Sequence, residues 1–288
     1  MNRRLRVAAI NFLNPAPLMW DFDHPPRNAE LAERYDVHLT KPSLCADELL
    51  NGRADLGLIP IASLTESLAI VPGCAIASLK QVRSIQLIAK GRGRNENPDD
   101  QLRAVRTVAT DSASRSSVAY AEILFRRFLG TNPKFVPHAA DPVAMLTNAD
   151  AALLIGDPAL LALENREEIE RTCGPCVWLD LAEQWTMRTG LPWVAAVWAV
   201  RPEALETTDI ANVLADDLQH SRDAGLRNVD RLVEEWSGRI TVPAETIRTY
   251  LTQNIYYTLS PECIESIRTF RAHAADLGVL PGTSLRFL

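Results

Sequence analysis

Short apolar segments alternate with segments of helical spacing along most of this chain of 288 residues. Between the apolar segments, apolar side chains recur every three or four positions, which is typical of helices packed on a sheet. Strands that alternate with helices indicate parallel βαβ units and therefore an α/β fold. The pattern occurs twice, before and after a polar, turn-rich loop at residues 91–101.

From Pro202 onward the spacing is almost entirely helical, and Pro243 and Pro261 stand where helices can begin. We expect strands at residues 6–12, 37–42, 54–60, 74–79, 84–90, 105–110, 134–137, 151–155, 177–180 and 193–200. We expect helices at residues 28–35, 46–53, 61–70, 116–129, 142–148, 158–171, 181–189, 203–235, 244–259 and 261–277.

The formal net charge of −6 gives no broad attraction for nucleic acid or for anionic membranes. No segment has the apolar length of a membrane span. Asn11, Asn14 and Pro15 interrupt the apolar start of the chain, so we interpret that start as a strand rather than a signal peptide. We therefore expect a cytoplasmic protein with a small-molecule partner, and the sequence leaves its oligomeric state open.

Residues Cys173–Cys176 read Cys-Gly-Pro-Cys, the spacing of a thioredoxin-type redox pair. Redox chemistry needs the first thiol at the start of a helix that follows a strand, because the helix end stabilises the thiolate. Here a helical segment precedes Cys173 and an apolar strand follows Cys176. This order is the reverse of the required one, so we interpret both cysteines as structural.

Ligands of parallel α/β sheets bind where strands end and helices begin. Asn14 stands at the exit of the first strand, in F-L-N-P-A-P-L. Its amide can donate and accept hydrogen bonds without a charge, which suits orientation of a hydroxyl or a carboxylate. A plain Asn turn before proline explains the same residue equally well.

The stretch D-S-A-S-R-S-S-V follows the strand at residues 105–110 and opens a helix. One serine there would be an ordinary N-cap, but the stretch places four hydroxyls and a guanidinium around one helix start. This pattern favours an anion-binding site. The candidate residues are Ser112, Ser114, Arg115, Ser116 and Ser117.

Two further positions belong to the same kind of junction. Gly156 would let a ligand approach the backbone, and Asp157 before Pro158 has the pattern of an N-cap, which is the favoured role for it. Ser84 is a polar residue at the entrance of an apolar strand, and it is either a surface position or a pocket contact.

Nucleotide-binding, nucleophile-elbow and metal-ligand motifs are absent from the sequence, and its five histidines are scattered. We expect no metal and no cofactor. An enzyme built from Asn, Ser, Arg and backbone dipoles would hold a polyanion well and would lack a strong general base.

Five motifs in this order resemble the chorismate dehydratase family, whose members catalyse the first step of the futalosine route to menaquinone. They are F-L-N-x-x-P-L near the N-terminus, G-R-A-D-L-G-L-I-P at 52–60, S-R-S-S-V at 114–118, A-D-A-A-L-L-I-G-D-x-A-L at 149–160 and W-x-x-x-T-G-L-P-W-V-x-A-V-W at 185–198. Ser116 stands where the family often has Thr, and Pro15 where a small polar residue is common.

The resemblance implies a two-lobed α/β fold of the type II periplasmic-binding-protein kind, with the ligand in a cleft between the lobes. Residues 1–88 with the C-terminal helices of 199–288 would form lobe one, and residues 89–198 lobe two. Such lobes can close on a ligand and exclude water.

The resemblance also implies conversion of the dianion chorismate to 3-[(1-carboxyvinyl)oxy]benzoate and water by a carbon–oxygen lyase. Asn14 would be the catalytic residue; Ser84, the serine-rich helix start, Gly156 and Asp157 would contact the substrate. A sister branch with the same fold makes 1,4-dihydroxy-6-naphthoate, but its first-strand motif differs. A non-catalytic small-anion binding protein of the same fold is the alternative from another class.

Overall fold

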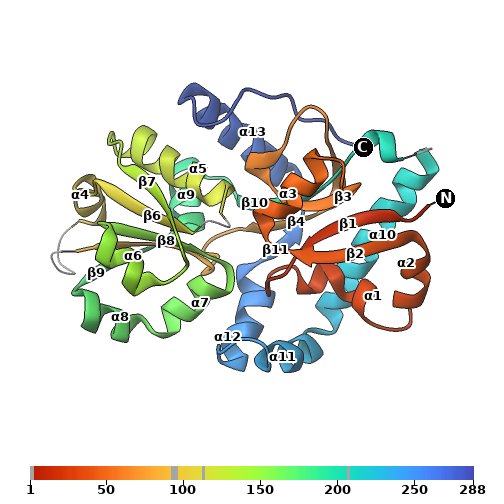
Figure 1. Cartoon of the computed structure of the whole chain (residues 1–288), viewed down its shortest axis with the longest axis horizontal. Helices are drawn as coiled ribbons and strands as arrows, with labels where there is room; N and C mark the ends of the chain where they lie inside the picture. The colour runs from red at the N-terminus through yellow and green to blue at the C-terminus, as the bar shows by residue number, and fades with distance from the viewer. Residues whose placement is uncertain (1–2, 92–96, 112–113, 206–207) are drawn as a thin grey trace.

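The computed structural model describes residues 3–91, 97–111, 114–205 and 208–288. Figure 1 shows two lobes, each built around one β-sheet, with both termini on the same lobe. The strands of the first sheet are β1 (Leu5–Ile10), β2 (Tyr35–Thr40), β3 (Leu56–Pro60), β4 (Ala69–Ser78), β10 (Trp193–Val200) and β11 (Tyr256–Thr258). The strands of the second sheet are β5 (Ile85–Lys90), β6 (Thr107–Asp111), β7 (Lys134–His138), β8 (Ala151–Ile155) and β9 (Cys176–Asp180).

Helices and helical turns cover both sheets (Figure 1). Around the first sheet lie η1 (Ala16–Met19), α1 (Trp20–Asp23), α2 (Asn28–Arg34), α3 (Pro42–Leu50), η2 (Ile61–Ser63), η4 (Pro202–Ala204), α10 (Thr208–Arg227), α11 (Val229–Ser237), α12 (Ala244–Thr249), η5 (Tyr250–Asn254) and α13 (Pro261–Asp276). Around the second lie α4 (Pro98–Arg103), α5 (Ser116–Ile123), η3 (Leu124–Phe128), α6 (Pro142–Asn148), α7 (Gly156–Glu164), α8 (Arg166–Cys173) and α9 (Leu181–Thr189).

The predicted parallel βαβ units are confirmed in both lobes. β1 pairs in parallel with β2 and β3, and β6 pairs in parallel with β7 and β8. Two central strands run the other way, because β10 is antiparallel to β3 and β4, and β5 is antiparallel to β8 and β9. The carboxyl ends of the parallel strands therefore meet the amino ends of β5 and β10 at the same edge of each sheet.

The chain crosses between the lobes before β5 and before β10. The division expected from the sequence, at 88/89 and 198/199, cuts through these two strands. β5 pairs only within the second sheet and β10 only within the first among the described residues. The connections that join the sheets are residues 79–84 and 181–192.

Several predicted helices end differently in the structure, among them the one expected at 203–235, which divides into η4, α10 and α11. The helix expected at 61–70 is wrong, because only the turn η2 forms and Ala69–Ile70 already belong to β4. The helix expected at 158–171 is two helices that meet at Asn165. The end of the segment 244–259 is the strand β11, which pairs with β4. In each case a short apolar run suits either structure, and contacts with neighbouring elements decide between them.

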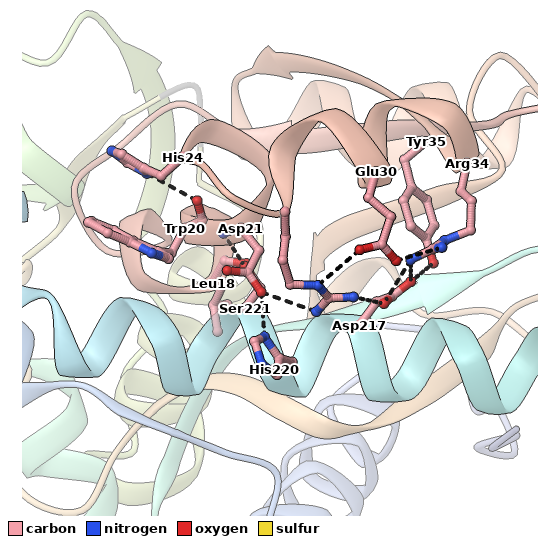
Figure 2. Close-up of polar contacts among 11 residues, drawn as sticks. Leu18, Trp20, Asp21, His24, Glu30, Arg34, Tyr35, Asp217, His220 and Ser221 are labelled. Carbon is pink, nitrogen blue, oxygen red and sulfur yellow. Dashed lines mark hydrogen bonds and ion pairs between the residues drawn. The ribbon is translucent and has the colours of Figure 1, made fainter.

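A buried ion cluster fastens α10 to the N-terminal part of the first lobe (Figure 2). Asp217 of α10 is 4% exposed and accepts hydrogen bonds from Arg27 at 2.6 Å, Arg34 at 2.9 Å and the Tyr35 hydroxyl at 2.8 Å. Three donors satisfy the buried carboxylate. The cluster fixes α10 against α2 and β2.

Candidate functional site

A cleft lies where the strand ends of the two sheets face each other. It holds ≈ 510 Å³ of space not filled by atoms, including its open mouth. Its wall consists of Ile10, Phe12, Asn14, Pro42, Pro60, Ile76, Val82, Ser84, Ile85, Ser114, Arg115, Ser116, Ser117, Ile155, Gly156, Trp193, Ala195 and Ala196.

Asn14 lies in the turn that follows the end of β1 at Ile10, on the side of the first lobe. The turn that carries it continues into η1, because Pro15 and Pro17 suit a tight helical turn. The Asn14 side-chain oxygen is buried and has no hydrogen-bond partner. A buried acceptor of this kind costs free energy unless a ligand or water pairs with it, so the unpaired oxygen marks a ligand-facing position.

The start of α5 faces Asn14 from the second lobe. Ser114, Ser116 and Ser117 all line the cleft, and the Ser114 hydroxyl is buried without a partner. The Ser116 hydroxyl has another task, because it donates to the Ala195 carbonyl at 3.1 Å and accepts from the Ala62 amide at 3.2 Å. Ser116 thus ties α5 to the first sheet. Ser112 lies outside the described residues.

Arg115 also lines the cleft, but its charge is already paired. Its guanidinium lies 2.7 Å from the Asp47 carboxylate of α3 and 3.4 Å from the Ser63 hydroxyl. Asp47 and Ser63 belong to the first lobe, so this ion pair spans the cleft. A substrate carboxylate would have to share Arg115 with Asp47.

Gly156 begins α7 with a φ of +64° and lies against the Phe12 ring. A Cβ atom there would stand 2.9 Å from the ring, closer than carbon atoms can approach. The glycine therefore serves a contact between the lobes, as well as forming part of the cleft wall. Ser84 is 3% exposed at the cleft, and its carbonyl accepts from the Gly156 amide at 2.8 Å.

The interpretation of Asp157 as an N-cap is wrong. Residue Ile155 occupies the cap position of α7, and no side chain caps this helix. The Asp157 carboxylate reaches across to the first lobe and accepts a hydrogen bond from the Leu13 amide at 3.1 Å. Burial raises its pKa to about 6, although the Leu13 amide opposes that rise. Asp157 lies behind the turn of Asn14 and is not part of the cleft wall.

Trp193 is a cleft residue that the junction argument missed. It is fully buried at the start of β10, lines the cleft, and its indole N–H has no partner. Tyr120 packs against its ring at 5.5 Å between centroids and donates its hydroxyl to the neighbouring Val194 carbonyl at 3.2 Å. In the sequence, Trp193 stood out only as part of the motif at 185–198. That motif supported the family resemblance and did not indicate a cleft residue.

The Cys-Gly-Pro-Cys stretch lies away from the cleft, as a helix–turn–strand connection. α8 ends at Cys173, Gly174 has a φ of +87°, and β9 begins at Cys176. Burial raises the pKa of both thiols, that of Cys176 to about 11. A redox pair needs the opposite shift. The helix–turn–strand order that the sequence predicted around the two cysteines is confirmed.

Within the described residues, no group of three or more His, Cys, Asp and Glu side chains could hold a metal ion. Over the same residues, none of the helices is both apolar enough and long enough to span a bilayer. The cleft offers hydrogen-bond donors and acceptors, an arginine and apolar walls, a set suited to binding and orienting a small polar molecule.

The fold and the cleft define a two-lobed protein of the periplasmic-binding-protein type, as predicted. An aliphatic sulphonate binding protein from Escherichia coli superposes with a TM-score of 0.66 at 13% identity, over 96% of this chain and 88% of that protein. A protein from Archaeoglobus fulgidus superposes with a TM-score of 0.73 at 14% identity, over 96% and 98% of the two chains. The model of the menaquinone biosynthesis family matches residues 5–276, and the chain belongs to this family. A chorismate dehydratase from Thermus thermophilus is 28% identical over 225 residues, 74% of this chain and 78% of that relative.

Proposed function

We propose that this protein is a chorismate dehydratase that forms 3-[(1-carboxyvinyl)oxy]benzoate and water on the futalosine route to menaquinone. Its family and the relative from Thermus thermophilus support the assignment. Chorismate carries two carboxylates and a C4 hydroxyl on a cyclohexadiene ring. Such a molecule needs polar partners at its edges and apolar walls against its ring, and the cleft offers both. A cytoplasmic location and function without a cofactor are parts of the same proposal.

The observation that carries the proposal is a set of three buried, unpaired polar atoms on one cleft. They are the Asn14 side-chain oxygen, the Ser114 hydroxyl and the Trp193 indole N–H. They come from the end of β1, the start of α5 and the start of β10, so local folding does not explain why they meet. A ligand with several oxygen atoms would satisfy them together.

In the proposed reaction the enolpyruvyl carboxylate of chorismate takes the hydrogen from C3. The electrons of the C3–H bond form the C3–C4 double bond as the C4–O bond breaks, and the hydroxyl leaves as water with the proton that the carboxylate took from C3. The ring becomes aromatic, which supplies the driving force. The cleft residues would hold the side chain over the ring, and Asn14 would bind the departing hydroxyl or a carboxylate. Orientation of this kind can supply a large share of a rate enhancement without an enzyme base.

The test is incubation of the pure protein with chorismate, followed by chromatographic identification of the product. We expect 3-[(1-carboxyvinyl)oxy]benzoate from the wild type. Asn14→Asp keeps the side-chain shape but adds a negative charge beside a dianion, so we expect almost no turnover from a folded protein.

Two other functions share the fold. A non-catalytic binding protein, which the likeness to solute-binding proteins keeps open, would bind chorismate or another anion and return it intact. A 1,4-dihydroxy-6-naphthoate synthase would not convert chorismate. Recovery of unchanged chorismate after prolonged incubation with folded protein would exclude the dehydratase.

A further inference from the structure

The turn of residues 12–14 is held at two consecutive backbone positions from opposite sides. The Leu13 amide donates to the Asp157 carboxylate of the second lobe at 3.1 Å. The Tyr257 hydroxyl of β11 donates to the Asn14 carbonyl at 2.9 Å. Both contacts act on the backbone next to the Asn14 side chain.

Tyr257 is well suited to hold this carbonyl. Its side chain is 3% exposed, and β11 is fixed to the edge of the first sheet by pairing with β4. Burial raises its pKa well above the usual value for tyrosine, so the hydroxyl stays protonated and remains a donor. Because the Tyr257 side chain is buried and its strand is paired, its hydroxyl holds the Asn14 carbonyl in one place.

The segment after Asn14 is seated separately on α10. The Ser221 hydroxyl donates to the Leu18 carbonyl at 2.8 Å and accepts from the Asp21 amide at 2.9 Å (Figure 2). Gly225 lies so close to Pro17 that a Cβ there would stand 2.2 Å from the Pro17 carbonyl oxygen. Residues 17–21 therefore have their own anchors. The turn of residues 12–14 has one local hydrogen bond, from the Ala16 amide to the Leu13 carbonyl at 3.1 Å, and the Asp157 and Tyr257 contacts hold it from distant parts of the chain.

We propose that Tyr257 and Asp157 are positioning residues for Asn14, Tyr257 from the same lobe and Asp157 from the opposite lobe. The inference rests on the proposed role of Asn14 in the reaction. Because Asp157 belongs to the second lobe, its contact requires the lobes to be together. The arrangement therefore couples closure of the cleft to the placement of the Asn14 amide.

The main experiment compares Tyr257→Phe with Tyr35→Phe as a matched control. Both residues are buried tyrosines of the first lobe that donate one hydrogen bond. The Tyr35 hydroxyl binds the Asp217 carboxylate of α10 and not the backbone of residues 12–14 (Figure 2). A shift of about 1 Å in a reacting group can cost about 100-fold in rate, so we expect Tyr257→Phe to lower kcat by about 10- to 100-fold with little change in KM. Tyr35→Phe should lower stability and leave kcat unchanged. Wild-type kcat in Tyr257→Phe would overturn the proposal.

A second pair of variants tests the contact from the second lobe. Asp157→Ala removes the acceptor for the Leu13 amide, whereas Asp157→Asn keeps an oxygen acceptor without a charge. We expect a loss of kcat in the alanine variant and recovery of most of it in the asparagine variant. A folded Asp157→Asn that binds chorismate and is inactive would identify Asp157 as the base and overturn its positioning role.

A measurement that needs no turnover separates this inference from the proposed function. In protein labelled with ¹⁵N-asparagine, the Asn14 side-chain amide signal can be assigned by its loss in Asn14→Asp. We expect this signal to shift or broaden in Tyr257→Phe and to stay unchanged in Tyr35→Phe. If the wild type does not consume chorismate, the proposed function fails, and the Asn14 amide signal alone tests the positioning roles. An unchanged signal in Tyr257→Phe would overturn the inference.

Discussion

The Ser114 hydroxyl is buried at the cleft and has no partner within the protein. Ser114→Ala should therefore not lower the free energy of unfolding, and it should weaken substrate binding by about 1–3 kcal/mol, the cost of an unpaired buried carboxylate oxygen. Steady-state kinetics and urea unfolding measure the two quantities. Ser237→Ala is the control, because that hydroxyl bonds to its own helix at the Val233 carbonyl. An unchanged KM in Ser114→Ala would remove the α5 start from the binding site.

Asp157 should give stability a distinct dependence on pH. Its pKa in the folded protein is raised to about 6, so between about pH 4 and 6 the folded state binds more protons than the unfolded state. Its contribution is complete below about pH 4 and is lost as the pH rises through 6, by up to about 2–3 kcal/mol. Asp157→Asn should remove this loss, so its stability relative to the wild type should increase from pH 4 to pH 7. Parallel urea curves for both proteins over that range would contradict the expectation.

At the scale of elements, Asp217 attaches α10 to α2 and β2 (Figure 2). Asp217→Asn leaves Arg27 and Arg34 without their shared carboxylate, and removal of one partner from a buried pair costs about 3–5 kcal/mol. The arginine side chains are 21% and 27% exposed, so we expect a smaller loss of about 2–3 kcal/mol. Glu30→Gln, at an exposed pair with Arg34, should cost less than about 1 kcal/mol. Equal losses in the two variants, measured by urea unfolding, would show that the cluster does not anchor α10.

At the scale of the whole molecule, Gly156 of the second lobe lies against the Phe12 ring of the first lobe. Gly156→Ala places a methyl group 2.9 Å from that ring and should hold the lobes apart, which would lower activity at least about 10-fold through misplacement of Asn14. Gly130→Ala is a matched control, because Gly130 lies outside the connections between the lobes, also has a positive φ, of +70°, and nothing lies within 4 Å of its Cβ position. Both variants carry about 1–2 kcal/mol of backbone strain, but only Gly156→Ala should increase the radius of gyration in solution scattering. Identical scattering from the two would show that this contact does not govern closure.

The sequence by itself determined which segments become strands and helices wherever local spacing was sufficient. The predicted α6, β8, α9 and β10 have the same bounds in the structure. It also indicated Asn14, the serine-rich start of α5 and Gly156 as cleft positions, and the structure brings them together. The predicted bounds are confirmed because the spacing of apolar side chains is a property of neighbouring residues. The junction of a strand with a helix is local in the same way, and the binding roles of the residues there stay predictions.

Only the tertiary structure decided what those residues contact. The partner of Asp157 is 144 residues away in the chain, and Tyr257 is separated from Asn14 by 243 positions. Trp193 became a cleft residue because β10 inserts between β3 and β4, a pairing that local spacing does not specify. Hydrogen bonds between distant segments depend on how the two sheets pack and how the lobes meet, and a side chain's type and immediate neighbours do not encode that arrangement.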